Sequence, residues 1–452
     1  MEITNPYLKR VYEKTVASNP QQPEFHQAVF EVFSSLDPVF NRHPEYEAID
    51  LMGRMVEPER MITFRVCWQD DRGGWHTNKG WRCQFNGAIG PFKGGLRFQK
   101  NVCDSVIKFL GFEQTFKNSL TGLPIGGAKG GSDFDPEGKS DAEIQRFCQS
   151  FMTALYRFIG PDVDVPAGDI GVGGREIGFL YGQYRRLKGA WENGVLTGKG
   201  LSYGGSLIRP EATGYGAVYY LCEVLKHEND TIAGKNIAVS GYGNVSWGIM
   251  KKAAQLGAKV TYMSGRDGYV YDPDGINTEE KLNYVLELRE KHLHCKPYAE
   301  KFGCKFVPNA KPWGEPGVDI CMPSATQNEV DLECAKKIVN SGVKYYMEVA
   351  NMPTTNEALA YLRAEKSIIV APSKAVNAGG VGVSALEMAQ NSERLVWTEE
   401  EVDAQLKKMM INIHKVSAEA AEEYGLGYDL VAGANIAGFK KVAEAMTEQG
   451  CF

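Results

Sequence analysis

The sequence has no long apolar run and no segment that resembles a targeting signal. Residues 1–6 lack the apolar core of a secretory signal. No uninterrupted apolar stretch approaches the roughly 20 residues that a membrane-spanning helix needs. The chain also lacks a cluster of lysine and arginine, and its net charge is -6, which argues against nucleic-acid binding. We therefore expect a cytoplasmic protein that binds neither membranes nor nucleic acids.

Cysteine is present, but without the spacing of a metal or redox site. The ten cysteines form no Cys-x-x-Cys pair, so we expect them to be reduced and mostly buried. The one local group with metal-ligand chemistry is His292, His294 and Cys295, with Cys304 nearby. It lies in a polar, lysine-rich segment where nothing fixes a tetrahedral geometry, so no metal is expected.

Length and glycine content are more informative. A chain of 452 residues is too long for one compact core, so two or three domains are expected. Glycine is enriched, at 50 of 452 residues or about 11%, against a usual share of roughly 7%. The glycines gather in short stretches around the motifs described below. This clustering predicts turns in which the backbone approaches a ligand closely.

The first part of the chain predicts a mixed-sheet domain. Helical periodicity and two strand-like segments come first, at 24–40, 60–66 and 81–85. Between residues 86 and 178 we expect lysine- and glycine-rich loops, interrupted by helices at about 104–120 and 140–159. This pattern is typical of a substrate domain built on a partly antiparallel sheet.

From about residue 205 the pattern becomes that of a dinucleotide-binding domain. A predicted helix at 212–227 leads to a buried strand at 236–240, and a second strand follows at 259–263. Between the two strands, the spacing Gly-x-Gly-x-x-Ser from Gly241 to Ser246 opens a helix that runs to Gln255. The glycines allow a tight turn and close approach of the backbone to a pyrophosphate. The motif alone is weak, but its strand–helix–strand frame favours a dinucleotide over a structural loop.

Three further strand signals, at 318–322, 345–349 and 368–371, each end in small or polar residues. Ligands bind at the carboxyl ends of strands in open parallel sheets, so these ends are expected to line the nicotinamide side of the site. We therefore predict an α/β fold of two domains separated by a cleft.

The domain bounds follow from the same patterns. We assign the mixed-sheet substrate domain to residues 1–204 and a Rossmann-like dinucleotide-binding domain to residues 205–427. A last helical pattern at about 400–424 leads the chain back to the first domain, to which residues 428–452 are assigned. No linker rich in proline or serine separates the halves, which favours a hinged cleft.

Lys129 lies among four glycines in the segment 123–131, and Asp169 follows forty residues later between glycine and isoleucine. An ammonium group held in a tight, partly desolvated pocket near another cation loses proton affinity and acts as an acid or base near neutral pH. The alternative is a surface turn that carries a solvated lysine and a turn-capping aspartate. The local sequence does not decide between the two.

Lys93 and Lys117 also lie in glycine-rich or small-residue settings. Taken singly, each is more typical of a solvated surface charge. Taken together with Lys129 and a dinucleotide domain, they indicate a pocket for a substrate with more than one carboxylate. Two of the lysines would anchor the anion and one would transfer protons, with Asp169 as the complementary carboxylate.

Longer strings in the chain identify a family. They are PFKGGLRF, GFEQTFKNSL, LPIGGAKGGSDFDP, VPAGDIGVGGREIG, GGSLIRPEATGYG, GYGNV, EVANMPTT, APSKAVNAGGV and SALEMAQNS, in family order between about residues 81 and 392. The whole chain resembles the small, hexameric bacterial glutamate dehydrogenases of the Glu/Leu/Phe/Val dehydrogenase family. Its pattern is most similar to that of the clostridial NAD-linked members.

The resemblance implies reversible oxidative deamination of L-glutamate to 2-oxoglutarate and ammonia with NAD or NADP, in a homohexamer assembled through the first domain. It implies that Lys93 and Ser384 bind the side-chain carboxylate. Lys117, with Gln114 nearby, would hold the α-carboxylate. Lys129 would activate water, and Asp169 would carry protons to and from the amine.

The resemblance also implies a set of residues around the cofactor. Arg209 and Thr213 lie in the segment that links the two domains, near the nicotinamide. The other members of the set contact the cofactor or support the site: Gly241, Gly243, Asn244, Val245, Ser264, Arg266, Asn351 and Asn377.

The choice between NAD and NADP stays open. An acid usually binds the ribose about 20 residues beyond the fingerprint, but Gly265 occupies that place here, and the neighbouring Arg266 is able to receive a 2′-phosphate. These residues favour NADP. The surrounding Ser-Gly-x-Asp-Gly-Tyr pattern resembles the NAD-linked members and favours NAD.

Two other functions compete with this one. A branched-chain or aromatic amino acid dehydrogenase shares the lysine and aspartate but binds an apolar side chain, whereas Lys93 with Ser384 indicates a second carboxylate. A non-catalytic relative that keeps only the fold would be expected to have lost Lys129 or Asp169, and both are present.

Overall fold

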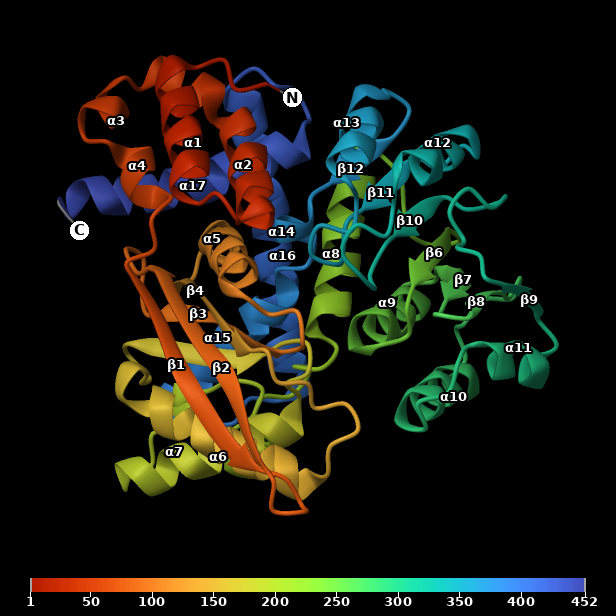
Figure 1. Ribbon diagram of the computed structural model, residues 1–452. Coiled ribbons are helices and arrows are strands. Elements are labelled where there is room, and N and C mark those ends of the chain that lie inside the picture. The colour runs from red at the N-terminus through yellow and green to blue at the C-terminus, as the bar shows by residue number, and fades with distance from the viewer. Residues whose placement is uncertain (1, 451–452) are drawn as a thin grey trace.

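Two β-sheets, each covered by helices, organise the chain in the computed structural model, which describes residues 2–450 (Figure 1). Within those residues, no helix has the length and apolar character needed to cross a membrane. The expected α/β class is confirmed.

The first sheet has five strands in the order β1-β2-β4-β3-β5. They are β1 (Arg60–Gln69), β2 (Trp75–Asn86), β3 (Phe92–Phe98), β4 (Gly126–Ser132) and β5 (Asp164–Gly168). β2 pairs antiparallel with β1 and β4, while β3 runs parallel to both β4 and β5. The sheet is therefore mixed, as the sequence indicated.

The prediction of glycine-rich loops around Lys93 and Lys129 was wrong, because both segments are buried strands, β3 and β4. Most of their glycines serve close packing. A methyl group on Gly94 would collide with the carbonyl oxygen of Ala128, and one on Gly127 would collide with the side chain of Thr115. The missing side chains thus let β3, β4 and a covering helix approach one another.

The two faces of this sheet carry separate apolar cores. One core packs under α1 (Pro6–Ser18), α2 (Pro23–Arg42), α4 (Leu51–Met55), α5 (Asp104–Leu120) and α17 (Leu430–Glu448). The other packs under α6 (Asp141–Leu155) and α7 (Gly174–Lys188). The short helix α3 (Glu45–Ala48) and the 3-10 turns η1 (Tyr156–Phe158), η2 (Asn193–Val195) and η3 (Leu201–Tyr203) lie in connections.

The C-terminal helix α17 packs against α5 and α2, so the end of the chain lies beside the first sheet (Figure 1). The helix before it, α16 (Glu399–Glu423), packs against α17 and against α8 (Ala212–His227) of the other half. The division at residues 204 and 427 stays a prediction.

The second sheet has seven strands in the order β12-β11-β10-β6-β7-β8-β9. They are β6 (Asn236–Ser240), β7 (Lys259–Ser264), β8 (Gly268–Tyr271), β9 (Lys305–Pro308), β10 (Ile320–Met322), β11 (Tyr345–Met347) and β12 (Ile369–Ala371). The first five in spatial order are parallel, and β8 and β9 are antiparallel additions at the edge.

The helices of this half follow the strands. They are α9 (Asn244–Gln255), α10 (Glu279–Glu290), α11 (Lys296–Phe302), α12 (Leu332–Asn340), α13 (Asn356–Ala364), α14 (Ser373–Val376) and α15 (Gly379–Glu393). The predicted helix 212–227 coincides with α8, and the fingerprint lies between β6 and α9. The strands predicted at 318–322, 345–349 and 368–371 are shorter, with three residues each.

Candidate active site

A cleft of about 1060 Å³ is lined by residues of both halves of the chain. From the first half come residues of β3, α5 and β4 and the segments that follow β5. From the second half come the start of α9, the loops after β10 and β11, and the start of α15. The loops after β10 and β11 therefore line the cleft, as expected from the topology of the sheet, whereas Pro372 and Ser373 after β12 are not among its lining residues.

Strand geometry brings the charged residues of the first sheet to one face. Side chains two residues apart in a strand point to the same side, so Lys93, Gly95 and Arg97 share a face of β3. The parallel register pairs Lys93 with Gly127, which places Lys129 on the same face of β4. A Cβ atom on Gly95 would lie 2.9 Å from Cβ of Asp169 and 3.4 Å from Nζ of Lys129. Here the glycine keeps space open between the catalytic candidates.

Asp169 bridges two cations. Its carboxylate accepts from Nζ of Lys129 at 2.9 Å and from Nε of Arg97 at 2.7 Å, and all three side chains are largely buried. Burial acts to raise the pKa of the Asp169 carboxyl, but Arg97 and Lys129 together hold it well below its ordinary value. Burial lowers the pKa of the Lys129 ammonium, and Asp169 limits that shift. The group thus combines an ionised carboxylate with an amine that gives up its proton more easily than free lysine.

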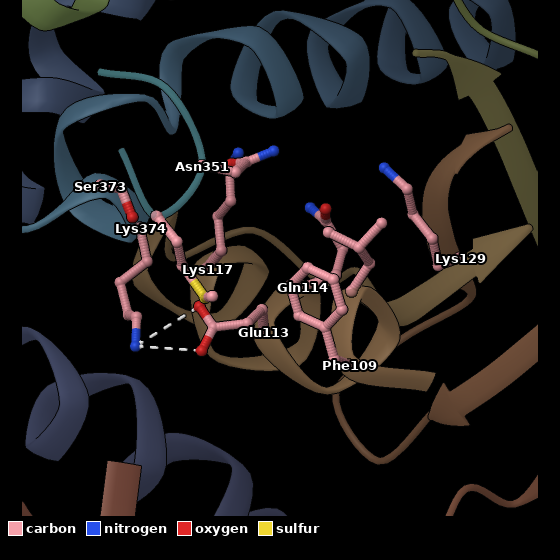
Figure 2. Close-up of a pocket in the computed structure, with 10 residues that line it drawn as sticks. Phe109, Glu113, Gln114, Lys117, Lys129, Asn351, Ser373 and Lys374 are labelled. Carbon is pink, nitrogen blue, oxygen red and sulfur yellow. Dashed lines mark hydrogen bonds and ion pairs between the residues drawn. The ribbon is translucent and has the colours of Figure 1, made fainter. Parts of the chain in front are cut away.

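Lys117 reaches the cleft from α5. Burial and the nearby Lys129 lower the pKa of its ammonium to about 7. Figure 2 shows Gln114 and Lys117 projecting from α5 beside Lys129. Gln114 donates to Oδ1 of Asn118 at 2.6 Å, which holds its amide in place next to the cleft.

Lys93 lies in a second cationic position. Its Nζ donates to Oγ1 of Thr197 at 2.8 Å, while Nε of Arg209 donates to Oγ of Ser384 at 2.8 Å. Burial first, and the charge of Arg209 next, lower the pKa of Lys93 well below that of free lysine. Arg209 therefore lies with Lys93 and Ser384, and its place near the nicotinamide stays a prediction.

Glu387 fixes the segment that carries Thr197. The carboxylate is fully buried on α15, one turn beyond Ser384, and accepts from N of Gly198 at 2.9 Å and from Nζ of Lys199 at 2.6 Å. These bonds hold the chain around Thr197 against Lys93. No local sequence pattern indicates Thr197 or Glu387, because each acts through a contact distant in the chain.

The fingerprint has the geometry that a pyrophosphate requires. Gly241 has φ +75°, a left-handed conformation that favours glycine, and its N–H donates to the carbonyl oxygen of Ser264 at 2.8 Å. Gly243 directly precedes α9, and Asn244 and Val245 of that helix line the cleft. Free N–H groups at a helix N-terminus suit an anion, so these residues fit a dinucleotide phosphate.

Asn351, Asn377 and Thr213, which belong to the second half of the chain, also line the cleft. Nδ2 of Asn377 donates to the carbonyl oxygen of Val349 and to Oδ1 of Asn351, both at 2.9 Å. Oδ1 of Asn377 is buried without a hydrogen-bond partner among the described residues. A ligand amide would satisfy it, which fits the carboxamide of nicotinamide.

Four predicted cofactor residues lie outside the cleft lining: Gly241, Gly243, Ser264 and Arg266. Ser264 is buried at the end of β7, and Arg266 is exposed beyond it. The neighbouring Asp267 accepts from the backbone N–H groups of Cys295 and Lys296, at 3.3 and 3.1 Å, and so caps α11. The carboxylate of Asp267, the acid that follows β7, is therefore already occupied by these hydrogen bonds.

The histidine and cysteine group at 292–304 forms no ligand set in this structure. The thiol of Cys295 donates to Asp267 at 3.2 Å. Across residues 2–450, no three side chains of histidine, cysteine, aspartate or glutamate are arranged to hold a metal ion.

Arg97 is the site residue that sequence reasoning should have found. It lies two and four residues beyond Gly95 and Lys93 in PFKGGLRF, and the period of a strand places all three on one face. The segment had been interpreted as a loop, so this period was not applied.

The chain matches two family models. Residues 58–186 match the Glu/Leu/Phe/Val dehydrogenase dimerisation domain, and residues 204–450 match Glutamate/Leucine/Phenylalanine/Valine dehydrogenase. The NAD-specific glutamate dehydrogenase of Clostridium symbiosum is 64% identical over 98% of this chain and 99% of its own. The NAD(P)-specific glutamate dehydrogenase of Xylanibacter ruminicola is 54% identical over 98% and 99%. A solved glutamate dehydrogenase structure superposes with a TM-score of 0.98 at 64% identity, over 99% of both chains.

Proposed function

Because the chain belongs to the Glu/Leu/Phe/Val dehydrogenase family, we propose that it catalyses the reversible oxidative deamination of L-glutamate to 2-oxoglutarate and ammonia, with NAD or NADP. One observation carries the choice of substrate. The cleft holds two cationic positions, Lys117 and the group of Lys93, Arg209 and Ser384, in addition to the Lys129–Asp169 pair. A dicarboxylate with an amine near one end matches this set.

The two cationic positions orient the substrate. Lys117, supported by Gln114, binds the α-carboxylate next to Lys129. Lys93 and Ser384 bind the side-chain carboxylate, and Arg209 adds a second positive charge there. Holding both ends of the molecule fixes the α-carbon and the amine relative to Lys129 and Asp169, and this orientation contributes to the rate.

The protein residues activate the attacking water and transfer protons. When bound, the nicotinamide supplies the ability to accept a hydride from the α-carbon, which leaves an iminium group on the substrate. Neutral Lys129 takes a proton from the water that attacks this carbon. Lys129 passes this proton to Asp169, which transfers it to the nitrogen of the resulting carbinolamine. The carbon–nitrogen bond then breaks with its electron pair on nitrogen, the hydroxyl oxygen forms the carbonyl and gives its proton to Asp169, and 2-oxoglutarate and ammonia result.

The ion pair with Arg97 suits Asp169 to this role. A carboxyl whose pKa is held so low does not retain a proton, so it passes the proton on to the more basic amine. The same negative charge stabilises the positive iminium beside it.

The substitution Lys93→Leu separates glutamate from apolar substrates. We expect kcat/KM for glutamate to fall by about two orders of magnitude, because the buried carboxylate loses its cationic partner. Activity on norleucine, which has no second carboxylate, should be unchanged or higher. Steady-state kinetics with both amino acids measure this, with the exposed Lys100→Leu as control. Equal losses on both substrates would favour the branched-chain or aromatic amino acid dehydrogenase.

The cofactor preference depends on the end of β7. Gly265 leaves no acid at the usual place, Asp267 is engaged in capping α11, and Arg266 is exposed beside them. We expect Arg266→Ala to lower kcat/KM for NADP about tenfold and to leave that for NAD nearly unchanged, since an exposed arginine–phosphate pair contributes modestly. Initial rates with each cofactor measure this. An equal effect on both cofactors would show that Arg266 does not contact the 2′-phosphate.

The assembly, the compartment and the domain bounds are further proposals. A homohexamer and a cytoplasmic location follow from the family resemblance. Exposed apolar side chains on the first half, Trp75, Phe158 and Val163, support assembly through that half.

A further inference from the structure

A buried ionic cluster adjoins the cleft but takes no part in the chemistry proposed above. Nζ of Lys374 contacts Oε1 of Glu31 at 3.0 Å, the carboxylate of Glu113 at 3.5 Å and Oδ1 of Asn435 at 2.6 Å. Figure 2 shows the Lys374–Glu113 contacts beside Lys117. The Lys374 side chain is only 2% exposed. Burying three ionisable groups is costly, so each must be well partnered for the cluster to persist.

The cluster joins the two halves of the chain. Glu31, Glu113 and Asn435 lie on α2, α5 and α17, which cover the first sheet. Lys374 lies on α14, the short helix that follows β12 of the second sheet. Asn435 also donates to Oγ of Ser35 at 3.0 Å, which fixes it between α17 and α2. One ammonium group thus connects three helices of the first half to the carboxyl edge of the second sheet.

On both sides of the cluster, the helices that carry it are connected to residues that line the cleft. Glu113 lies one helical turn before Lys117 on α5, so it faces the same side of the helix. The helix that carries Lys374 ends at Val376, and the following residue, Asn377, donates to Oδ1 of Asn351 at 2.9 Å. The contact between Lys374 and Glu113 therefore connects the helix that carries Lys117 to the segment that leads to Asn377 and Asn351.

The space between these residues is small. A pocket of about 20 Å³ is bounded by Glu113, Lys117, Asn351, Ser373 and Lys374, among others. That volume has room for a water molecule and not for a substrate. The two sides are thus closely apposed, and a shift of either would change the distance from Lys117 to the cofactor side.

The ionisation of the cluster residues supports a stable contact between the two halves of the chain. Burial acts to lower the pKa of Lys374, but Glu113 and Glu31 hold it above the ordinary value, so the ammonium stays charged. Burial raises the pKa of Glu113 to about 7, although Lys374 acts against this.

We propose that Lys374 is a positioning residue for the reaction. Its ammonium, held by Glu31, Glu113 and Asn435, fixes α5 against the carboxyl edge of the second sheet and thereby sets the position of Lys117 relative to Asn351 and Asn377. The role rests on the proposed function, because it assigns Lys117 to the substrate and the asparagines to the cofactor side. A purely stabilising ion cluster would have the same contacts, so the test must separate stability from geometry.

The test compares two variants of the full-length protein. Lys374→Met removes the ammonium and leaves two carboxylates unpaired, so it should lower the thermal midpoint as well as the activity. The triple variant Glu31→Gln, Glu113→Gln, Lys374→Met removes every charge of the cluster and should regain much of the stability. Lys281→Met is the matched control, because it removes a largely buried ion pair with Asp272 away from the cleft.

We expect both Lys374 variants to lose about tenfold or more in kcat/KM for glutamate, with a higher KM for glutamate and a nearly unchanged KM for the cofactor. The triple variant should keep this loss while its thermal midpoint returns toward that of the wild type. Lys281→Met should lower the midpoint and leave both KM values within twofold of wild type.

Two results would overturn the role of Lys374. One is a triple variant with wild-type kcat/KM, and the other is a loss that follows only the folded fraction in both Lys374 variants. Wild-type protein that does not oxidise glutamate would instead contradict the proposed function itself, and the role of Lys374 with it. The wild-type assay therefore distinguishes the two failures.

Discussion

Replacing Lys129 by methionine should lower kcat for glutamate oxidation by about three orders of magnitude, the scale of a lost general base. Methionine keeps the length of the side chain in a strand where Lys129 is almost fully buried, so the fold should persist. The water that attacks the substrate would then lack a group to accept its proton. Thermal unfolding and binding of the reduced cofactor provide the controls for folding and for an intact cofactor site.

The pH dependence of this variant adds a second readout. Lys129 acts as a base only when neutral, so the wild-type rate should rise as the pH increases through its pKa. Burial lowers that pKa, so the rise should occur at lower pH than free lysine would allow. In Lys129→Met this rise should disappear. If Lys129→Met keeps kcat within tenfold of wild type and has the same pH profile, Lys129 is not the general base.

Asp169→Asn should also lower kcat strongly, by about two to four orders of magnitude. The amide cannot carry a proton between Lys129 and the amine, and it does not balance the charge of the iminium. It also removes the group that holds the pKa of Lys129 up, so that pKa should fall further. Single-turnover rates with saturating glutamate and cofactor measure the effect on chemistry separately from binding.

Arg97→Gln is the matched control for Asp169→Asn. It removes the 2.7 Å contact to the carboxylate but leaves Asp169 and Lys129 in place. Without the charge of Arg97 the pKa values of both Asp169 and Lys129 should rise. The rise of the rate with pH, which follows Lys129, should therefore move to higher pH, while kcat at its optimum falls less than in Asp169→Asn. Equal losses in the two variants would indicate that Asp169 serves only as the partner of Arg97.

The five parallel strands of the second sheet could be predicted from sequence because their signals are local, whereas the antiparallel edge strands β8 and β9 were not predicted. The helix at 212–227, the strand at 236–240 and the turn from Gly241 depend on short apolar runs and on glycine at fixed positions. The strands near 320 and 346 came out shorter, since strand ends depend on pairing with neighbours that the local sequence does not contain.

The first sheet was harder to predict because glycine is common both in ligand-binding loops and in closely packed strands. In the strand with Lys129, glycines at 126, 127, 130 and 131 were interpreted as a ligand-binding loop, yet they remove side chains that would collide with β2, β3 or α5. The sequence alone does not show which backbone will lie opposite a glycine. Lys129 does line the cleft, as predicted. The expected role of glycine, which is to keep space open at the site, applies to Gly95 and not to the glycines that flank Lys129.

Site residues that lie in recognisable motifs were predicted from the sequence. Site residues whose role depends on a contact with a distant part of the chain were not. Lys93, Lys117, Lys129 and Asp169 all line one cleft. Thr197 was missed because its importance lies in a hydrogen bond to Lys93, whereas Arg97 was missed because its strand was interpreted as a loop. The contact of Arg209 with Ser384 could not be predicted either, because sequence order does not show where that side chain turns.

Product analysis of the purified protein tests the proposed activity most directly. L-glutamate is supplied with NAD or with NADP, and reduced cofactor, 2-oxoglutarate and ammonia are quantified in the same reaction. We expect all three to form in equal amounts with at least one of the cofactors, and much faster from glutamate than from norleucine or leucine. Absence of cofactor reduction with both NAD and NADP, or faster oxidation of the apolar amino acids, would contradict the assignment of this cleft to glutamate.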